Sequence, residues 1–145
     1  MNSKNNTHKP RFRFIGYLIK ETKMDLSSNV YGKDLKLDII PFGDLDEENR
    51  SLNVDLSVSV SDNENKLSLK FLISGHFEFE CGNFEELKPY ICMNAPAILF
   101  PYIRAYTTTI TSLAGSNPII MPTLNLEGVG KQLLSLIENK QLNKK

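Results

Sequence analysis

Two neighbouring stretches in which apolar and polar residues alternate limit the fold most tightly. Every second residue from Leu52 to Val60 is apolar, and the residues between them are Asn, Asp or Ser. The pattern resumes at Leu67, after the turn-forming residues 62–65. A period of two is typical of a strand with one buried face, and a short polar turn joins antiparallel neighbours. We therefore predict a hairpin of two strands, 51–61 and 66–81.

Two further strands are predicted upstream of this hairpin. Residues 31–41 also alternate between apolar and charged side chains, and an acidic loop over 42–50 should follow them. Residues 11–26 are rich in apolar side chains, but the apolar positions change parity near Phe14 and Ile15. Such a change indicates either a β-bulge or a strand that is covered on both faces.

The second half of the chain carries helical signals. A short helical turn is expected over 83–90, and a longer helix should begin at Asn94, whose side chain can cap it. Gly115 should end the longer helix, and the prolines that follow should keep the next residues extended. The predicted helical and extended segments after the strands are 83–90, 94–113, 117–124 (extended) and 127–141.

Four strands followed by two main helices predict an α+β fold. The helices should pack on one face of a four-stranded antiparallel sheet, because each helix has to bury its apolar stripe. The length of 145 residues fits one domain. We expect a disordered N-terminal tail over residues 1–10, a folded domain over 11–141 and a basic C-terminal tail over 142–145.

A long tract with almost no charge suggests where this chain interacts. From Met93 to Leu126 the only charged side chain is Arg104. Apolar surface of this extent has to be covered by the chain's own sheet, by a partner subunit or by a bound ligand. The sequence leaves these three alternatives open.

Several functional classes lack the residues that they require. The formal net charge is zero and no basic patch is interleaved with aromatic residues, so we expect no nucleic-acid partner. Two cysteines and two histidines in unrelated positions predict no metal site, and no Gly-rich phosphate loop or nucleophile–base pair points to a cofactor or to an enzyme. The residues before Phe12 form no apolar leader and no stretch is long enough to span a membrane, so we expect a cytoplasmic protein without direct membrane insertion.

One heptapeptide carries a resemblance to a known family. The string from Ile98 to Arg104, Ile-Leu-Phe-Pro-Tyr-Ile-Arg, resembles a motif of the SecB-like chaperone family, which places a near-identical string at the start of its long helix. The aromatic-led segment from Tyr31 to Asp38 and the Pro-rich apolar segment 118–126 are also similar to that family. The resemblance covers roughly residues 12–137.

The resemblance implies a SecB-like fold that dimerises and then forms a tetramer, a dimer of dimers. It also implies ATP-independent capture of unfolded polypeptide clients, with the export ATPase SecA as a further partner. In toxin–antitoxin versions of the family the client is an antitoxin. One departure concerns SecA, because export chaperones of this family are strongly acidic, whereas this chain is neutral and ends in Lys144 and Lys145.

Candidate site residues follow from the chemistry of holding an unfolded chain. Aromatic, methionine and aliphatic side chains adapt to many clients. The predicted peptide-binding residues are Tyr31, Phe77, Phe79, Ile119, Ile120, Met121 and Leu124. The predicted oligomer interface consists of Phe100, Tyr102, Tyr106, Thr109 and Leu113. Burial in the chain's own core is the competing interpretation for each apolar member.

The favoured hypothesis is therefore a homo-oligomeric holdase that keeps unfolded or nascent polypeptides competent for export or assembly. The alternative is a dedicated chaperone that protects one client, such as an antitoxin. A small-molecule binder or an enzyme on the same scaffold is a third hypothesis, and it is disfavoured by the lack of a catalytic constellation.

Overall fold

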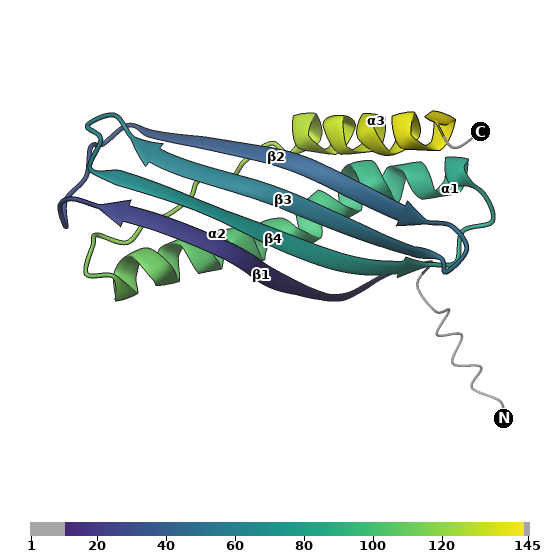
Figure 1. The fold of residues 1–145 in the computed structure, drawn as a ribbon, viewed down its shortest axis with the longest axis horizontal. Coiled ribbons are helices and arrows are strands. Elements are labelled where there is room, and N and C mark those ends of the chain that lie inside the picture. The colour runs from purple at the N-terminus through teal and green to yellow at the C-terminus, as the bar shows by residue number, and fades with distance from the viewer. Residues whose placement is uncertain (1–10, 144–145) are drawn as a thin grey trace, which may run out of the picture.

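The computed structural model describes residues 11–143 and shows one antiparallel sheet with helices on one face (Figure 1). The strand order in the sheet is β1-β4-β3-β2. The elements in chain order are β1 (Phe12–Leu26), β2 (Leu35–Asp46), β3 (Ser51–Asp62), β4 (Leu67–Phe79), α1 (Phe84–Pro89), the π-helical turn η1 (Tyr90–Asn94), α2 (Ala95–Leu113) and α3 (Glu127–Asn143). The predicted α+β fold is confirmed.

The predicted hairpin is the centre of the sheet. β3 and β4 pair in an unbroken antiparallel register in which Leu56 faces Ile73 and Val58 faces Phe71. These apolar residues are buried, and the polar residues between them lie on the other face of the sheet. The period of two in the sequence therefore corresponds to one covered and one open face.

The parity change in the first strand is a pair of β-bulges. The pairing of β1 with β4 shifts register between Phe14 and Gly16 and again between Ile19 and Glu21. Each bulge moves the following side chains to the other face. As a result Ile15 and Leu18 are 53% and 62% exposed on an edge strand.

The prediction of an acidic loop over 42–50 is wrong. β2 continues through Pro41 and Gly43 to Asp46, and only four residues separate it from β3. Proline is tolerated here because β2 is an edge strand. Gly43 lies under α3, where a Cβ would come within 2.7 Å of Ile137 Cδ1, so the missing side chain makes room for the helix. Lys140 Nζ also donates a hydrogen bond to the Gly43 carbonyl at 2.8 Å.

The helical region is more continuous than the sequence suggested. Asn83 caps α1 as predicted, with its Oδ1 accepting the Glu86 N–H at 2.9 Å. The chain then passes through η1 directly into α2, so Asn94 is already helical and its side chain caps nothing. A cap is required only where a helix begins from non-helical backbone. α2 ends at Leu113 with Ala114 as its C-cap, and Gly115 follows with a φ of +84°, a conformation that favours glycine.

The two long helices cover different parts of the same sheet face. α2 lies behind β1 and β4, while α3 lies along β2 (Figure 1). α3 ends at Asn143, two residues beyond its predicted end, so the predicted C-terminal tail begins inside the helix. The predicted tail at 1–10 lies outside the described residues. The largest fully buried side chains are Leu52, Leu56, Leu67, Leu69, Ile73, Phe77, Leu87, Ile91, Leu99, Ile103, Ile119 and Leu133.

Candidate functional site

The segment that joins α2 to α3 exposes an apolar side chain between two buried ones. Residues 117–126, which we call the crossover segment, run extended without forming a strand or a helix. Ile119 and Met121 point into the core and are 1% and 5% exposed, whereas Ile120 between them is 78% exposed. An extended backbone alternates its side chains between two sides. The segment therefore anchors itself with two apolar side chains and presents a third to solvent.

Two threonines of α2 hold the crossover segment in this orientation. Thr108 Oγ1 donates to the Ile119 carbonyl at 2.6 Å, and the Ile119 N–H donates to Thr111 Oγ1 at 3.0 Å. Both backbone polar groups of the buried residue Ile119 are thus satisfied by side chains. Thr107 lies one turn earlier and is fully buried, with its hydroxyl donating to the Ile103 carbonyl.

The loop between β1 and β2 holds the other side of the crossover segment. The Tyr31 hydroxyl donates to the Pro118 carbonyl at 3.1 Å, and the Asn117 N–H donates to the Asn29 carbonyl at 2.9 Å. Partial burial raises the pKa of Tyr31, so its hydroxyl stays protonated and remains a donor at neutral pH. The crossover segment is consequently fixed between α2 on one side and this loop on the other.

The predicted peptide-binding residues fall into two groups. Tyr31 and Leu124 are half-buried and Ile120 is exposed, and these three lie on or beside the crossover segment. The other four are in the core, where the helices cover them from solvent: Phe77, Phe79, Ile119 and Met121. Their burial differs from the prediction, because an alternating strand and a packed segment use their largest side chains to hold the helices.

The predicted interface residues on α2 are also divided. Phe100 is buried, with the Arg104 guanidinium 5.9 Å from the centre of its ring. Tyr106 is half-buried, and its hydroxyl is 2.6 Å from Thr22 Oγ1 on β1. Thr109 is exposed and Leu113 is 84% exposed. Only part of the predicted stripe is therefore free to contact a second molecule.

Apolar residues on β1 extend this exposed surface, and sequence reasoning missed them. The ring of Tyr102 on α2 packs against that of Tyr17 on β1, with centroids 4.3 Å apart, and both side chains remain partly exposed. Ile15 and Leu18 lie on the same edge strand but face the open side of the sheet, in one hollow with His76 and Asn53. The change of parity in the sequence was the signal for these positions, but it did not say which side chains the bulges would expose.

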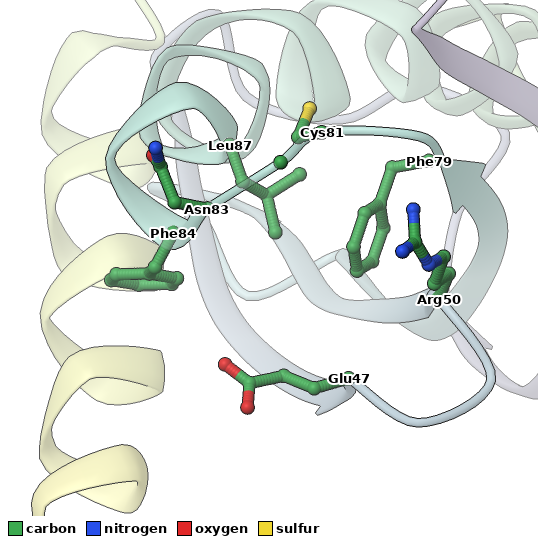
Figure 2. A pocket seen from close by; sticks show the side chains of 8 residues that line it. Glu47, Arg50, Phe79, Cys81, Asn83, Phe84 and Leu87 are labelled. Carbon is green, nitrogen blue, oxygen red and sulfur yellow. The ribbon is translucent and has the colours of Figure 1, made fainter.

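A small cavity lies at the end of the sheet where α1 begins. It has a volume of about 240 Å³, and Figure 2 shows Phe79 and Leu87 lining it, with the charged groups of Glu47 and Arg50 at its rim. Cys81 also belongs to its lining, with its thiol pointing away from the other lining side chains (Figure 2). Burial raises the pKa of this thiol, and the negative charge of Glu86 acts in the same direction. A thiol held in its protonated form is a poor nucleophile.

The described residues offer little to a catalytic or metal-binding role. Between residues 11 and 143 no three His, Cys, Asp or Glu side chains are placed to hold a metal ion. His76 lies on the open face of the sheet, with its Nδ1 2.8 Å from Asn53 Oδ1. No helix in this part of the chain is long and apolar enough to cross a membrane.

Comparison with known proteins places the fold and the sequence in one family. The family model described as SecB, preprotein translocase subunit SecB, matches residues 33–134. The protein-export protein SecB of Dechloromonas aromatica is 38% identical over 61 residues, which cover 42% of this chain and 40% of that protein. SecB of Nitrosomonas eutropha is 27% identical over 126 residues, covering 71% of this chain and 79% of the relative.

A solved structure shares the fold at lower sequence similarity. The SecB-like chaperone of Mycobacterium tuberculosis, in complex with a ChAD peptide from the HigA1 antitoxin, superposes with a TM-score of 0.66 at 19% identity. The superposition covers 79% of this chain and 91% of that one. Because the family model spans β2, β3, β4, α2 and the first part of α3, which is more than half of the chain, this chain belongs to the SecB family.

Proposed function

We propose that this protein is an ATP-independent holdase, a molecular chaperone that binds unfolded or nascent polypeptides and keeps them competent for export or assembly. Membership of the SecB family supports a chaperone role. The observation that carries the proposal is the exposure of Ile120 on a segment whose two neighbours are buried. A fixed apolar side chain in solvent has no role in the chain's own core and is available to a client.

The crossover segment can recognise unfolded chains in two ways. Its backbone is extended, and no hydrogen bond within the described residues uses the backbone groups of Ile120 or Met121. A client strand can pair with such groups whatever its sequence, while its apolar side chains pack on Ile120. Tyr31, which bonds to Pro118, and Leu124, four residues further along the segment, supply further half-buried apolar surface. The binding residues we propose are therefore Tyr31, Ile120 and Leu124, supported from below by Ile119 and Met121.

We further propose that the chain acts as a homo-oligomer in the cytoplasm, with a dimer of dimers as the expected state. The exposed Leu113 and Tyr102 on α2, together with Tyr17 and Leu18 on β1, support a contact between copies. Several weak client sites on one oligomer act together, because binding at one site raises the local concentration at the next. SecA remains a proposed partner.

A dedicated-client chaperone is the second candidate, with an antitoxin as the expected client. Its support is the formal net charge of zero, which differs from the acidic character that the resemblance to export chaperones implies. The Mycobacterium chaperone of the same fold was solved with an antitoxin peptide, so the fold is compatible with such a client. An enzymatic role has no supporting cluster of groups among the described residues.

Light scattering of a chemically unfolded test protein, diluted without ATP, tests general holding. We expect near-stoichiometric wild-type protein to suppress aggregation. Ile120→Ser should bind the client at least about tenfold more weakly, because burying one such side chain contributes about 1.5–3 kcal/mol and each ~1.4 kcal/mol is a factor of ten. Leu142→Ser is the matched control, since Leu142 is comparably exposed but lies near the C-terminal end of α3, away from the crossover segment.

Two results would count against this scheme. If folded wild-type protein leaves aggregation unchanged, general holding is contradicted and the dedicated-client alternative stands. If Ile120→Ser and Leu142→Ser act alike, the client surface is not at the crossover segment.

A further inference from the structure

Asp62 is a buried carboxylate that is held by backbone groups. It is the last residue of β3, is 8% exposed, and accepts three backbone N–H groups. Its Oδ1 accepts from Lys66 at 2.9 Å and Leu67 at 3.1 Å, and its Oδ2 accepts from Gly32 at 2.7 Å. Burial alone would raise the pKa of Asp62, but these N–H donors outweigh burial and lower it, so the group is charged at neutral pH.

The two oxygens of Asp62 serve different parts of the chain. Oδ1 closes the turn between β3 and β4, where Asn65 has a φ of +56°. This is the ordinary use of an aspartate in a turn. Oδ2 reaches out of the turn to Gly32 in the connection between β1 and β2. The turn is complete without that second bond, so Oδ2 serves to link two separate loops.

The Gly32 backbone lies close against this turn. A Cβ at Gly32 would lie 2.0 Å from Asn63 Oδ1 and 2.9 Å from Glu64 Oε2. Gly32 is also buried, although both of its neighbours in sequence are more exposed. The absence of a side chain lets the backbone N–H reach Asp62, so the position of this loop depends on the carboxylate.

The anchored loop is the one that holds the crossover segment. Tyr31 precedes Gly32 and donates its hydroxyl proton to the Pro118 carbonyl. Pro118 lies two residues before Ile120, the exposed apolar residue. A continuous path of hydrogen bonds and one peptide unit therefore runs from Asp62 through Gly32 and Tyr31 to the crossover segment.

From this path we infer that Asp62 is a positioning residue for client binding: its Oδ2 bond to Gly32 sets Tyr31, and through Tyr31 the crossover segment, in the arrangement that accepts a client. This role rests on the proposed holdase function. Asp62 makes no contact with the client itself. A protein whose competent arrangement is only partly populated binds with an affinity reduced by that fraction.

The substitution Asp62→Asn separates the two uses of the carboxylate. An asparagine keeps one side-chain oxygen, which the two N–H groups of the turn, Lys66 and Leu67, can share. Its NH2 group then faces the Gly32 N–H, and two donors cannot bond. The turn is retained and the link to the β1–β2 loop is lost. Tyr31→Phe removes the next bond in the path and keeps the aromatic ring.

The experiment measures the dissociation constant of full-length protein for a fluorescently labelled, reduced and carboxymethylated α-lactalbumin. We expect Asp62→Asn and Tyr31→Phe each to weaken binding about fivefold. In each variant a smaller fraction of the molecules should hold the crossover segment in the arrangement that accepts a client. The double variant should bind about as well as either single variant, because both remove the same path. Tyr90→Phe is the matched control, since Tyr90 is a half-buried residue of η1 and no hydrogen bond to its hydroxyl is present within residues 11–143. Urea unfolding of each variant separates affinity from stability.

The outcomes distinguish this role from the function on which it rests. If the fold-changes in dissociation constant of the two single variants multiply in the double variant, the positioning role is overturned and the holdase function stands. The same conclusion follows if Asp62→Asn binds the probe as tightly as wild type. Failure of folded wild-type protein to bind the probe would overturn the holdase function and the positioning role together. A loss of stability without a change in affinity would show that Asp62 is only a structural residue of the turn.

Discussion

At the residue scale, small polar side chains determine which apolar residues are exposed in the stretch of low charge from Met93 to Leu126. The threonines of α2 look in the sequence like a polar helix face, yet Thr107 and Thr111 are fully buried. Thr111 receives the Ile119 N–H, and Thr108 donates to the Ile119 carbonyl. These bonds fix the rotation of the crossover segment about its own axis, which determines that Ile120 and not Ile119 is exposed.

The contrast between Thr111 and Thr107 gives a prediction at this scale. Thr111→Val keeps the shape of the side chain but leaves the buried Ile119 N–H without an acceptor, so it should reduce the free energy of unfolding by about 1–3 kcal/mol. Thr107→Val loses only a bond to the Ile103 carbonyl and should cost less than about 1 kcal/mol. Urea unfolding at fixed protein concentration compares the two, and equal losses would contradict the anchoring role of Thr111.

At the scale of elements, glycines set how closely the helices approach the sheet and one another. Gly75 admits the side chain of Leu99 from α2, and Gly43 admits Ile137 from α3. Gly130 is the closest of these contacts, because a Cβ there would lie 1.8 Å from the carbonyl oxygen of Cys92 in η1. The π-helical turn and α3 therefore touch backbone to backbone, which fixes where the crossover segment must end.

The glycines of α3 provide a matched pair for testing this contact. Gly130→Ala has to move α3 away from a backbone atom that cannot rotate aside, and it should lower the unfolding free energy by about 1–3 kcal/mol. Gly128→Ala lies two residues earlier in the same helix with no atom within 4 Å of the new Cβ, and it should be neutral or stabilise by up to about 1 kcal/mol. Thermal unfolding followed by circular dichroism measures both. A Gly130 variant as stable as the Gly128 variant would show that the two backbones are not in contact.

At the scale of the whole molecule, the sheet has one covered face, one open face and an apolar free edge. β1 and β2 are the two edge strands, and α3 covers the inner face of β2. Ile15, Tyr17 and Leu18 along β1 are 53%, 45% and 62% exposed, although the ring of Tyr102 packs against that of Tyr17. Exposed apolar edge strands promote association between chains, so this edge supports the proposed contact between copies.

We expect the protein to be larger than a monomer in solution, and Leu18→Lys should shift it towards the monomer. The lysine places a charge on the exposed edge, where pairing with a second strand would desolvate it. Light scattering coupled to size-exclusion chromatography measures the mass. Leu142→Lys is the control, because Leu142 is similarly exposed but lies near the end of α3. A monomeric wild type would contradict the oligomer, and a reduced mass in both variants would contradict the choice of edge.

The sequence alone determined the strands, their antiparallel order in the hairpin and the positions of the long helices. Alternation from Leu52 to Val60 and the turn at 62–65 specify one buried face, because side-chain parity in a strand is a local property. The extent of β2 was misjudged at Pro41 and Gly43, since proline and glycine normally end strands. Their tolerance here comes from the edge position and from the approach of α3.

Only the tertiary structure decided which apolar residues face solvent. The sequence offers no reason to prefer Ile119, Ile120 or Met121 as the exposed residue. It likewise does not separate Phe77 from Tyr31 as candidates for a client surface. The direction of each side chain depends on contacts from distant segments: Thr108 and Thr111 orient Ile119, and Asp62 and Tyr31 hold the loop opposite. Local pattern thus specifies elements, whereas exposure is set by hydrogen bonds and packing between residues that are far apart in the chain.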